Sequence, residues 1–277
     1  YGPANGMPDA REVVADYVAR TRGIECGADE VTIVPGGKPT MFYAMLALID
    51  VGDEVIYPNP GFPIYESMIN FVNGKAVACP LREVNGFALD PQDLISRITP
   101  KTKMVILNSP ANPTGGVTER AELEAVLKVL KDYPDIWILS DEIYARMLYD
   151  GIEHVSPMQD PEIRDRVILL DGWSKTYAMT GWRIGYAGGP EGTALITTAY
   201  YLLGILLNPE NKEIPFPLIL TGPAGSEEYF RQIDSFIKLT LGEVARQHYT
   251  IIIGDAAKVA REISAGLESV RNFRRVH

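Results

Sequence analysis

The side chains with the most evident chemistry lie in short polar segments that follow apolar runs of sequence. Lys175 follows the run 167–170, beside the hydroxyl of Ser174 and ahead of Arg183. A lysine in such a polar, aromatic loop can condense with an aldehyde, because a partly desolvated amine near other cations loses its proton more easily. The forked guanidinium of Arg183 suits a phosphate. Taken alone, the Ser-Lys pair is also compatible with an ordinary surface lysine.

Two further segments supply an amide and a carboxylate. Asn112 begins an Asn-Pro-Thr-Gly turn, and Asp141 follows the apolar run 137–140. Burying a carboxylate at the end of a strand costs free energy unless a cation pairs with it, and a pyridinium nitrogen is such a cation. The simpler alternatives are an ordinary Asn-Pro turn at Asn112 and a helix N-cap at Asp141.

A glycine-rich turn and an aromatic ring complete the candidates. Gly36 and Gly37 join a predicted strand to a predicted helix, so the backbone N–H groups from this turn to Lys38 would point at an anion over the helix start. A Gly-Gly turn is nonspecific by itself. Phe62 follows another strand and offers an aromatic face, although core packing is its default role.

The elements that must position these residues alternate as in a parallel α/β sheet. Apolar runs rich in β-branched residues predict strands, and apolar residues at helical spacing predict the helices between them. In such sheets ligands bind beyond the carboxyl ends of the strands, where the candidates lie. The predicted strands are 31–34, 54–57, 75–79, 104–108, 137–140, 167–170, 218–221 and 249–253. The predicted helices are 9–21, 40–49, 119–131 with Thr118 as its N-cap, 192–207, 226–247 and 256–269.

The composition is that of a globular chain and disfavours several partners. The 277 residues are 46% hydrophobic and 22% charged, with a formal net charge of −10. Such an acidic chain is unsuited to nucleic acid or anionic membranes. The apolar runs are shorter than the roughly 20 residues of a membrane-spanning helix. Cys26 and Cys79 fit neither a disulfide framework nor a metal-binding motif, which favours a reducing, cytoplasmic location and no metal site.

The order of these motifs resembles the large domain of fold-type I, class I/II aminotransferases, which use pyridoxal 5′-phosphate. The resemblance covers roughly residues 1–190. It implies a three-layer α/β/α fold with a mostly parallel, Rossmann-like sheet, and an enzyme that transfers an amino group between an amino acid and a 2-oxo acid. The residues that carry it are Tyr1, Gly36, Gly37, Lys38, Phe62, Asn112-Pro113-Thr114-Gly115, Asp141-Glu142-Ile143-Tyr144, Ser174, Lys175 and Arg183.

The resemblance also implies a role for each residue. Lys175 would form the internal aldimine and move the proton, and Asp141 would hold the pyridine nitrogen protonated. Asn112 and Tyr144 would bind the phenolic oxygen, and Phe62 would stack on the ring. The phosphate would be held by the turn Gly36-Gly37-Lys38, by Ser174 and Arg183, and by Tyr1 of a neighbouring subunit, which requires a homodimer.

Residues 191–277 depart from this family. The family's small domain carries an arginine that pairs with the substrate α-carboxylate, and we find no counterpart of its motif. The segment 192–275 instead resembles the C-terminal part of nucleotide 5′-monophosphate nucleosidases of the lysine-decarboxylase-like (LOG) family, with Ile196 where their catalytic glutamate belongs. The segments that carry this second resemblance are 201–212, 215–223 and 248–257.

The sequence therefore predicts a chimera of two Rossmann-like pieces, 1–190 and 191–277, whose strands could continue one sheet. The leading function is a pyridoxal-phosphate-dependent aminotransferase, because the cofactor site is complete in sequence. Turnover requires more than this site, since deprotonation at the substrate Cα also requires the substrate to be held. The alternatives are phosphoribohydrolase chemistry on nucleoside monophosphates and a folded but inactive scaffold.

Overall fold

The computed structural model describes residues 3–190, 218–222 and 249–253 of the chain. The chain divides into two compact units, residues 1–201 and 202–277, and each is described by itself.

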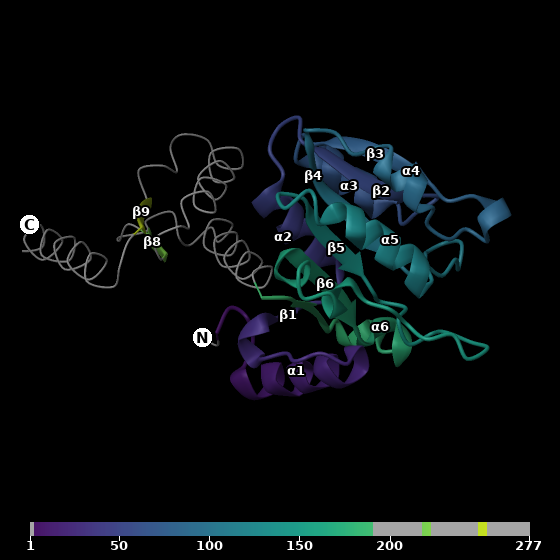
Figure 1. Ribbon diagram of the computed structural model, residues 1–277. Helices are drawn as coiled ribbons and strands as arrows, with labels where there is room; N and C mark the ends of the chain where they lie inside the picture. The colour runs from purple at the N-terminus through teal and green to yellow at the C-terminus, as the bar shows by residue number, and fades with distance from the viewer. Residues whose placement is uncertain (1–2, 191–217, 223–248, 254–277) are drawn as a thin grey trace, which may run out of the picture. The chain divides into compact units, whose positions relative to one another are not determined.

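The first unit is built on a seven-stranded sheet with the order β1-β7-β6-β5-β4-β2-β3 (Figure 1). The neighbours from β3 to β6 pair in parallel, and β7 runs antiparallel to both β6 and β1. This confirms the predicted α/β fold with a mostly parallel sheet. The strands are β1 (Val31–Val34), β2 (Glu54–Asn59), β3 (Lys75–Pro80), β4 (Thr102–Asn108), β5 (Trp137–Asp141), β6 (Val167–Gly172) and β7 (Gly185–Gly188).

Strand β7 is an element that the sequence patterns do not predict. Its run Gly-Tyr-Ala-Gly lacks the β-branched residues that mark the other strands. Its glycines instead permit close approach, because a Cβ added to Gly185 would lie 2.6 Å from the backbone carbon of Gly36. Packing between neighbouring strands therefore selects this strand, not its own β propensity.

Helices cover both faces of the sheet. On β6, Leu169 belongs to a core cluster that also contains Val18 of α1 and Val126 of α5. The next residue, Leu170, points the other way, toward Gly37 at the start of α2. The three-layer arrangement is thus observed. The helices are α1 (Pro8–Arg22), α2 (Lys38–Leu48), α3 (Ile64–Phe71), α4 (Pro91–Ile95), α5 (Arg120–Leu130) and α6 (Trp173–Thr176).

Short 3₁₀ turns join several of these elements. They are η1 (Ala28–Glu30), η2 (Glu83–Asn85), η3 (Pro157–Gln159), η4 (Arg164–Arg166) and η5 (Thr180–Trp182).

The start of α5 differs from the expectation by one residue. Glu119, not Thr118, is the N-cap, and it forms a reciprocal capping box with Glu122. The backbone N–H of Thr118 instead donates to Ser109 Oγ at 2.9 Å. Thr118 is therefore held by the turn after β4.

The described part of the second unit is a pair of parallel strands, β8 (Leu218–Gly222) and β9 (Tyr249–Ile253). Both were expected as strands. The expected helices 192–207, 226–247 and 256–269 lie outside the described residues, so the domain boundary and the continuation of one sheet stay predictions. Among the described residues, no helix is long and apolar enough to cross a bilayer.

Candidate functional site

A cavity of about 400 Å³ lies at the carboxyl ends of the central strands. Asn108 at the end of β4, Asp141 at the end of β5 and Leu170 of β6 form its floor, as expected for a parallel sheet. The predicted site residues that line it are Gly37, Lys38, Phe62, Asn112, Asp141, Tyr144, Ser174, Lys175 and Arg183. Tyr1, the remaining predicted contact apart from Gly36, lies outside the described residues.

Gly36 lies behind this cavity and makes room for Arg183. Its φ is +83°, and a Cβ placed on it would be 2.2 Å from Arg183 Nη2. Arg183 itself adopts a left-handed backbone conformation with φ 53°, and its Nη1 donates to Thr180 O at 2.8 Å. The guanidinium thus lies beside the turn that starts α2, where backbone N–H groups and a cation together suit an anion.

Asp141 is the buried carboxylate of the cavity. Its Oδ2 accepts a hydrogen bond from Tyr65 Oη at 2.6 Å, and its Oδ1 accepts one from the backbone N–H of Ile143 at 3.3 Å. Burial raises the pKa of Asp141 to about 6, although both hydrogen bonds lower it. Asp141 begins no helix, so the N-cap alternative is wrong.

Tyr65, on α3, is a site residue that sequence reasoning missed. It is fully buried, and burial together with the Asp141 charge raises the pKa of its phenol well above the usual value. Its ring packs edge-on against Phe62, with centroids 5.8 Å apart. The two residues are joined by the turn that leads into α3, in which the Tyr65 N–H donates to the Phe62 carbonyl at 3.0 Å, and no pattern in the sequence indicates this pairing.

Lys175 stands on the single-turn helix α6, with its Nζ 5.8 Å from the ring centroid of Tyr144. Its side chain is exposed, so the expected partial desolvation of this amine is wrong. Lys175 lines the cavity and is not part of the buried core.

Phe62 and Lys38 form a second cation and ring pair at the cavity. Lys38 Nζ lies 5.6 Å from the centroid of the Phe62 ring. Phe62 is half-buried and lines the cavity, so core packing is not its role. The Lys38 side chain is exposed and adds positive charge near the start of α2.

Asn112 is held by the strand that precedes it. Its backbone N–H donates to Asn108 Oδ1 at 2.9 Å, and Asn108 Nδ2 donates to the carbonyl of Asp141 at 3.0 Å. The side chain of Asn112 lines the cavity. The turn therefore presents an amide to the same space as Asp141 and Lys175.

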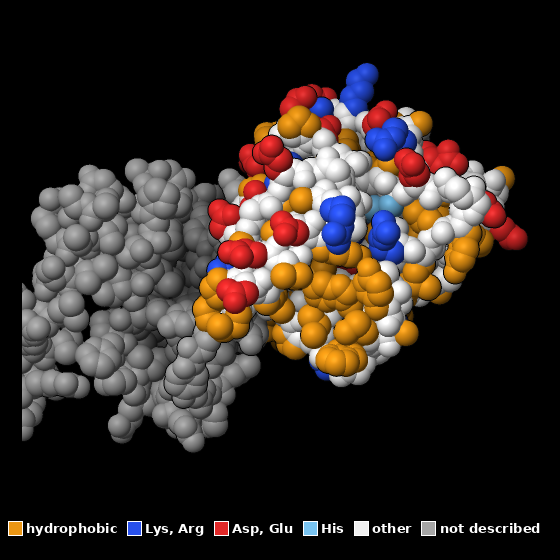
Figure 2. Space-filling model, turned by 90° about the horizontal axis from the view of Figure 1, so that it is seen from below, with side chains coloured by type: hydrophobic (Ala, Val, Ile, Leu, Met, Phe, Trp, Pro, Cys, Tyr) orange, Lys and Arg blue, Asp and Glu red, His pale blue; other side chains and the backbone are white. Residues whose placement is uncertain are grey.

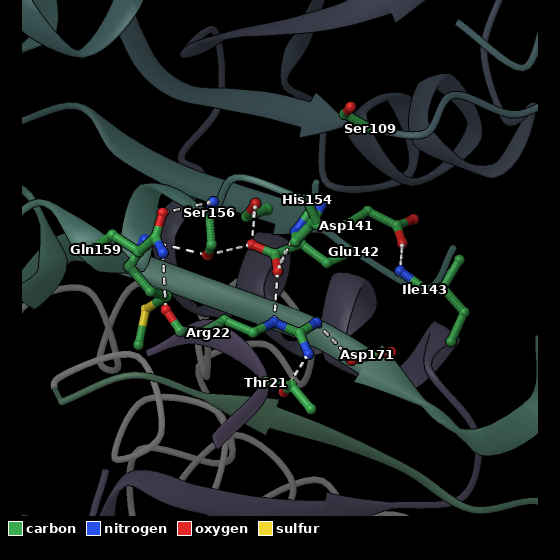
Figure 3. Close-up of polar contacts among 12 residues, drawn as sticks. Thr21, Arg22, Ser109, Asp141, Glu142, Ile143, His154, Ser156, Gln159 and Asp171 are labelled. Atoms are coloured by element: carbon green, nitrogen blue, oxygen red, sulfur yellow. Dashed lines mark hydrogen bonds and ion pairs between the residues drawn. The ribbon is translucent and has the colours of Figure 1, made fainter. Parts of the chain in front are cut away.

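Behind Asp141 lies a buried polar network that the sequence analysis did not identify (Figure 3). Arg22, from the last turn of α1, donates from Nε to Glu142 Oε2 at 2.9 Å and from Nη2 to Asp171 Oδ2 at 2.6 Å. Glu142 also accepts from Ser156 Oγ at 2.5 Å and contacts His154 Nε2 at 2.8 Å. Helix α1 is thus fixed to the strand ends that carry the cavity.

The charges of this network set the titration of its carboxylates. Burial would raise the pKa of Glu142, but His154 and Arg22 outweigh it and lower the pKa to about 2. Burial raises the pKa of Asp171 despite its contact with Arg22. Both carboxylates in turn contribute to the raised pKa of Asp141.

The surface beside the cavity is apolar. A groove of about 480 Å³ shares Asn112 and Tyr144 with the cavity and also includes Met147, Tyr149 and Ile152, which are exposed. Figure 2 shows apolar side chains gathered on one face of the described part, next to Lys and Arg side chains. Within the described ranges, no group of three His, Cys, Asp or Glu side chains is placed to hold a metal ion.

Comparisons with known proteins agree with this geometry. A family model described as "Aminotransferase class I and II" matches residues 1–205. An aspartate aminotransferase of Rhizobium meliloti is 40% identical over 192 residues, which are 69% of this chain and 47% of that protein. A probable aspartate/prephenate aminotransferase of Aquifex aeolicus is 33% identical over 228 residues, covering 77% of this chain and 58% of that protein.

Solved structures show the same fold. The crystal structure of the Rhizobium meliloti aspartate aminotransferase matches with a TM-score of 0.70 at 33% identity, over 90% of this chain and 58% of that one. The Thermus thermophilus aspartate aminotransferase with maleate matches with a TM-score of 0.69 at 32% identity, over 89% and 59%. The chain spans about half the length of the curated relatives it matches.

Proposed function

We propose, from the premise that this chain belongs to the class I and II aminotransferase family, that it acts as a pyridoxal-phosphate-dependent aminotransferase between an amino acid and a 2-oxo acid. Members of this family use pyridoxal 5′-phosphate. One observation carries the proposal: Asp141 at the end of β5 lines the same cavity as Lys175 and Arg183, which follow β6.

The cavity fits a phosphorylated pyridine. Its volume of about 400 Å³ lies in the range of small-molecule sites. Asp141 is a buried carboxylate that a protonated ring nitrogen would neutralise, and its raised pKa marks a site that favours such a partner. The missing Cβ of Gly36 leaves Arg183 beside the start of α2, as a phosphate requires.

The chain's own residues would divide the work as follows. The bound cofactor supplies the electron sink for negative charge that develops at the substrate Cα. Asp141 would hold a proton at the pyridine nitrogen. The Lys175 amine would bind the aldehyde carbon until the substrate amine displaces it, and the freed amine would then move the proton at Cα. Asn112 and Tyr144 would hydrogen-bond the phenolic oxygen, while Phe62 would pack on the ring.

The phosphate would be held at the other end of the cavity. Arg183, Ser174 and the backbone of Gly37 and Lys38 would bind its oxygens. Tyr1 of a second subunit would complete this cradle in a homodimer. The exposed apolar groove beside the cavity supports such a partner, because contiguous apolar surface is a common mark of an interface.

We propose an acidic amino acid as the donor. The relatives named above are aspartate or aspartate/prephenate aminotransferases. In this chain the exposed ammonium of Lys38 lines the cavity and could meet a second carboxylate. The ratio of kcat/KM for aspartate to that for alanine tests this, and Lys38→Met should lower it at least about tenfold, the effect of a lost charge-assisted hydrogen bond.

Absorbance tests the cofactor claim. Wild-type protein incubated with pyridoxal 5′-phosphate should become yellow, with an absorbance that titrates with pH, and Lys175→Ala should abolish the colour. Lys131→Ala, at the end of α5 next to Glu162, is the matched control and should retain it. A wild-type protein that stays colourless would overturn the proposal.

Two further expectations remain proposals. Cytoplasmic location is supported by the free thiols of Cys26 and Cys79. The nucleosidase-like origin of 192–275, with its phosphoribohydrolase alternative, rests on residues that lie almost entirely outside the described ranges. Release of a free base from a nucleoside monophosphate is the measurement that would support that alternative.

A further inference from the structure

Asn108 links two of the residues that the proposed cofactor would contact. It is the last residue of β4, and its side chain is buried. Oδ1 accepts a hydrogen bond from the backbone N–H of Asn112 at 2.9 Å, and Nδ2 donates to the carbonyl oxygen of Asp141 at 3.0 Å. A single buried amide thus bridges the turn after β4 and the end of β5.

At Asn112 the turn after β4 is held by the side-chain amide of Asn108. Its own backbone hydrogen bonds run from Ala111 N–H to Gly116 O and from Gly115 N–H to Ala111 O, both at 2.8 Å. Neither of them uses the N–H of Asn112, which donates to the Asn108 side chain. The side-chain amide of Asn108 therefore fixes the backbone position of Asn112, and with it the point from which the Asn112 side chain extends.

The same amide extends the pairing of β4 with β5. Asn108 and Asp141 are partners in the parallel register and are the last pair of that ladder. The side-chain hydrogen bond to the Asp141 carbonyl adds a further link between the two strands at this end of the ladder. Asp141 is fixed by its main chain at this point, independently of its carboxylate contacts.

Asn108 also lines two spaces. One is the cavity of about 400 Å³, and the other is a small cavity of about 30 Å³ that Glu142 and His154 also line. A space of that size can hold a water molecule. Truncation of the side chain would leave the carbonyl of Asp141 without this donor and open to a competing water.

We propose that Asn108 is a positioning residue that holds Asn112 and Asp141 at a fixed separation across the cofactor site. The inference rests on the proposed function, in which Asn112 meets the phenolic oxygen and Asp141 meets the ring nitrogen. Neither role requires Asn108 to touch the cofactor. A displacement of about 1 Å in such groups is enough to change the chemistry they support.

Amide hydrogen exchange in the protein without added cofactor tests the link directly. In Asn108→Ala the Asn112 N–H loses its acceptor, and its exchange should be about fivefold faster, the factor that corresponds to one ordinary hydrogen bond. Asn108→Asp keeps an acceptor for the Asn112 N–H but loses the donor to the Asp141 carbonyl, so Asn112 should lose less protection than in Asn108→Ala. Unchanged exchange in Asn108→Ala, or equal loss of protection in both variants, would overturn the link.

The cofactor-loaded protein tests the positioning. A hydrogen bond to the phenolic oxygen stabilises its anionic form, so a displaced Asn112 should move the pH midpoint of the bound cofactor's absorbance upward in Asn108→Ala. Thr102→Val is the matched control, because Thr102 is buried at the opposite end of β4 and its Oγ1 accepts from Thr99 N–H at 2.9 Å. It should lower stability and leave the midpoint in place.

A midpoint that stays at the wild-type value in Asn108→Ala, or that moves equally in Thr102→Val, would overturn the positioning role. The positioning role of Asn108 and the proposed function can be disproved separately. If wild-type protein forms no coloured complex, the proposed function fails, while the exchange of Asn112 still decides whether Asn108 holds the turn.

Discussion

Tyr65 donates a hydrogen bond from its phenol to Asp141, with 2.6 Å between Oη and Oδ2. Both groups are buried, so the hydrogen bond is made out of contact with bulk water. It stabilises the ionised carboxylate, and it opposes the burial that raises the pKa of Asp141. The aromatic residue from α3 thus helps to maintain the charge that the proposed ring nitrogen needs.

Tyr65→Phe should therefore raise the pKa of Asp141 above its value of about 6. A hydrogen bond to a charged group contributes about 1.5–3 kcal/mol, or about one to two pKa units, so the ionised fraction of Asp141 and with it the affinity for pyridoxal phosphate at pH 7 should fall about two- to fifteenfold. The wild-type affinity should return in part at higher pH, where Asp141 is ionised again. Titration of affinity against pH measures this. Tyr57→Phe removes another buried phenol and should not shift the profile.

Asp141→Asn should stabilise the protein without added cofactor at neutral pH. The pKa of Asp141 is about 6 in the folded state, against a reference value of 3.8. The protonated carboxyl therefore costs the fold no stability below about pH 4, and its ionisation lowers the free energy of unfolding as pH rises through 6. The gain in free energy of unfolding should be on the order of 2 kcal/mol at pH 8 and should nearly vanish at pH 4. Urea denaturation at both values tests it. Equal effects of the substitution at both pH values would contradict the assigned cause.

Arg22→Met should be strongly destabilising because it leaves Glu142 and Asp171 buried without their cation. Removing one partner from a buried ion pair costs about 3–5 kcal/mol, whereas an exposed pair contributes about 0–1 kcal/mol. Lys131→Met, which breaks the more exposed contact to Glu162, is the control. Denaturation at pH 7 compares the two. Similar small losses in both variants would show that Arg22 is not the neutralising charge.

The acid limb of the stability curve should change in the same variant. The pKa of Glu142 is lowered to about 2, so its contribution is present above about pH 4.5 and is lost as pH falls through 2. Without Arg22 that loss should begin at higher pH. The acid unfolding midpoint of Arg22→Met should therefore exceed that of wild type, and a coincident midpoint would argue against this coupling.

The sequence predicts the parts of this site that are local and leaves out those that depend on distant contacts. Lys175, Asp141 and the Gly36-Gly37 turn follow predicted strands, and the geometry of a parallel sheet brings such ends together. The partners of the carboxylates come from far along the chain: 76 residues separate Tyr65 from Asp141, and 120 separate Arg22 from Glu142. No periodicity in a single sequence encodes such a pairing, since it arises when helices pack on the sheet.

The local rules also fail where packing decides. Lys175 is exposed and lines the cavity, although its loop is polar and aromatic and led us to expect a partly desolvated amine. Strand β7 has weak β propensity, yet the glycines that weaken it let it fit between β6 and β1. In both cases tertiary packing overrides the structure that the composition of the segment predicts.

Gly36→Ala should weaken anion binding more than it weakens the fold. The substituted Cβ would lie 2.2 Å from Arg183 Nη2, the end of a flexible side chain, so the guanidinium must move away from the start of α2. Gly52→Ala is a close control, because Gly52 has a φ of +88° against +83° for Gly36 and nothing within 4 Å of the added atom. Both variants bear the same backbone strain, about 1–2 kcal/mol, and should lose similar free energy of unfolding.

The affinity for inorganic phosphate or pyridoxal phosphate should separate the two variants. Gly36→Ala should bind at least about tenfold more weakly, since the charge-assisted hydrogen bonds of Arg183 to the phosphate contribute about 1.5–3 kcal/mol. Gly52→Ala should bind as wild type does. Equal affinities in the two variants would mean that Arg183 does not hold the phosphate from its observed position, whereas the predicted difference locates the anion between its guanidinium and the first turn of α2.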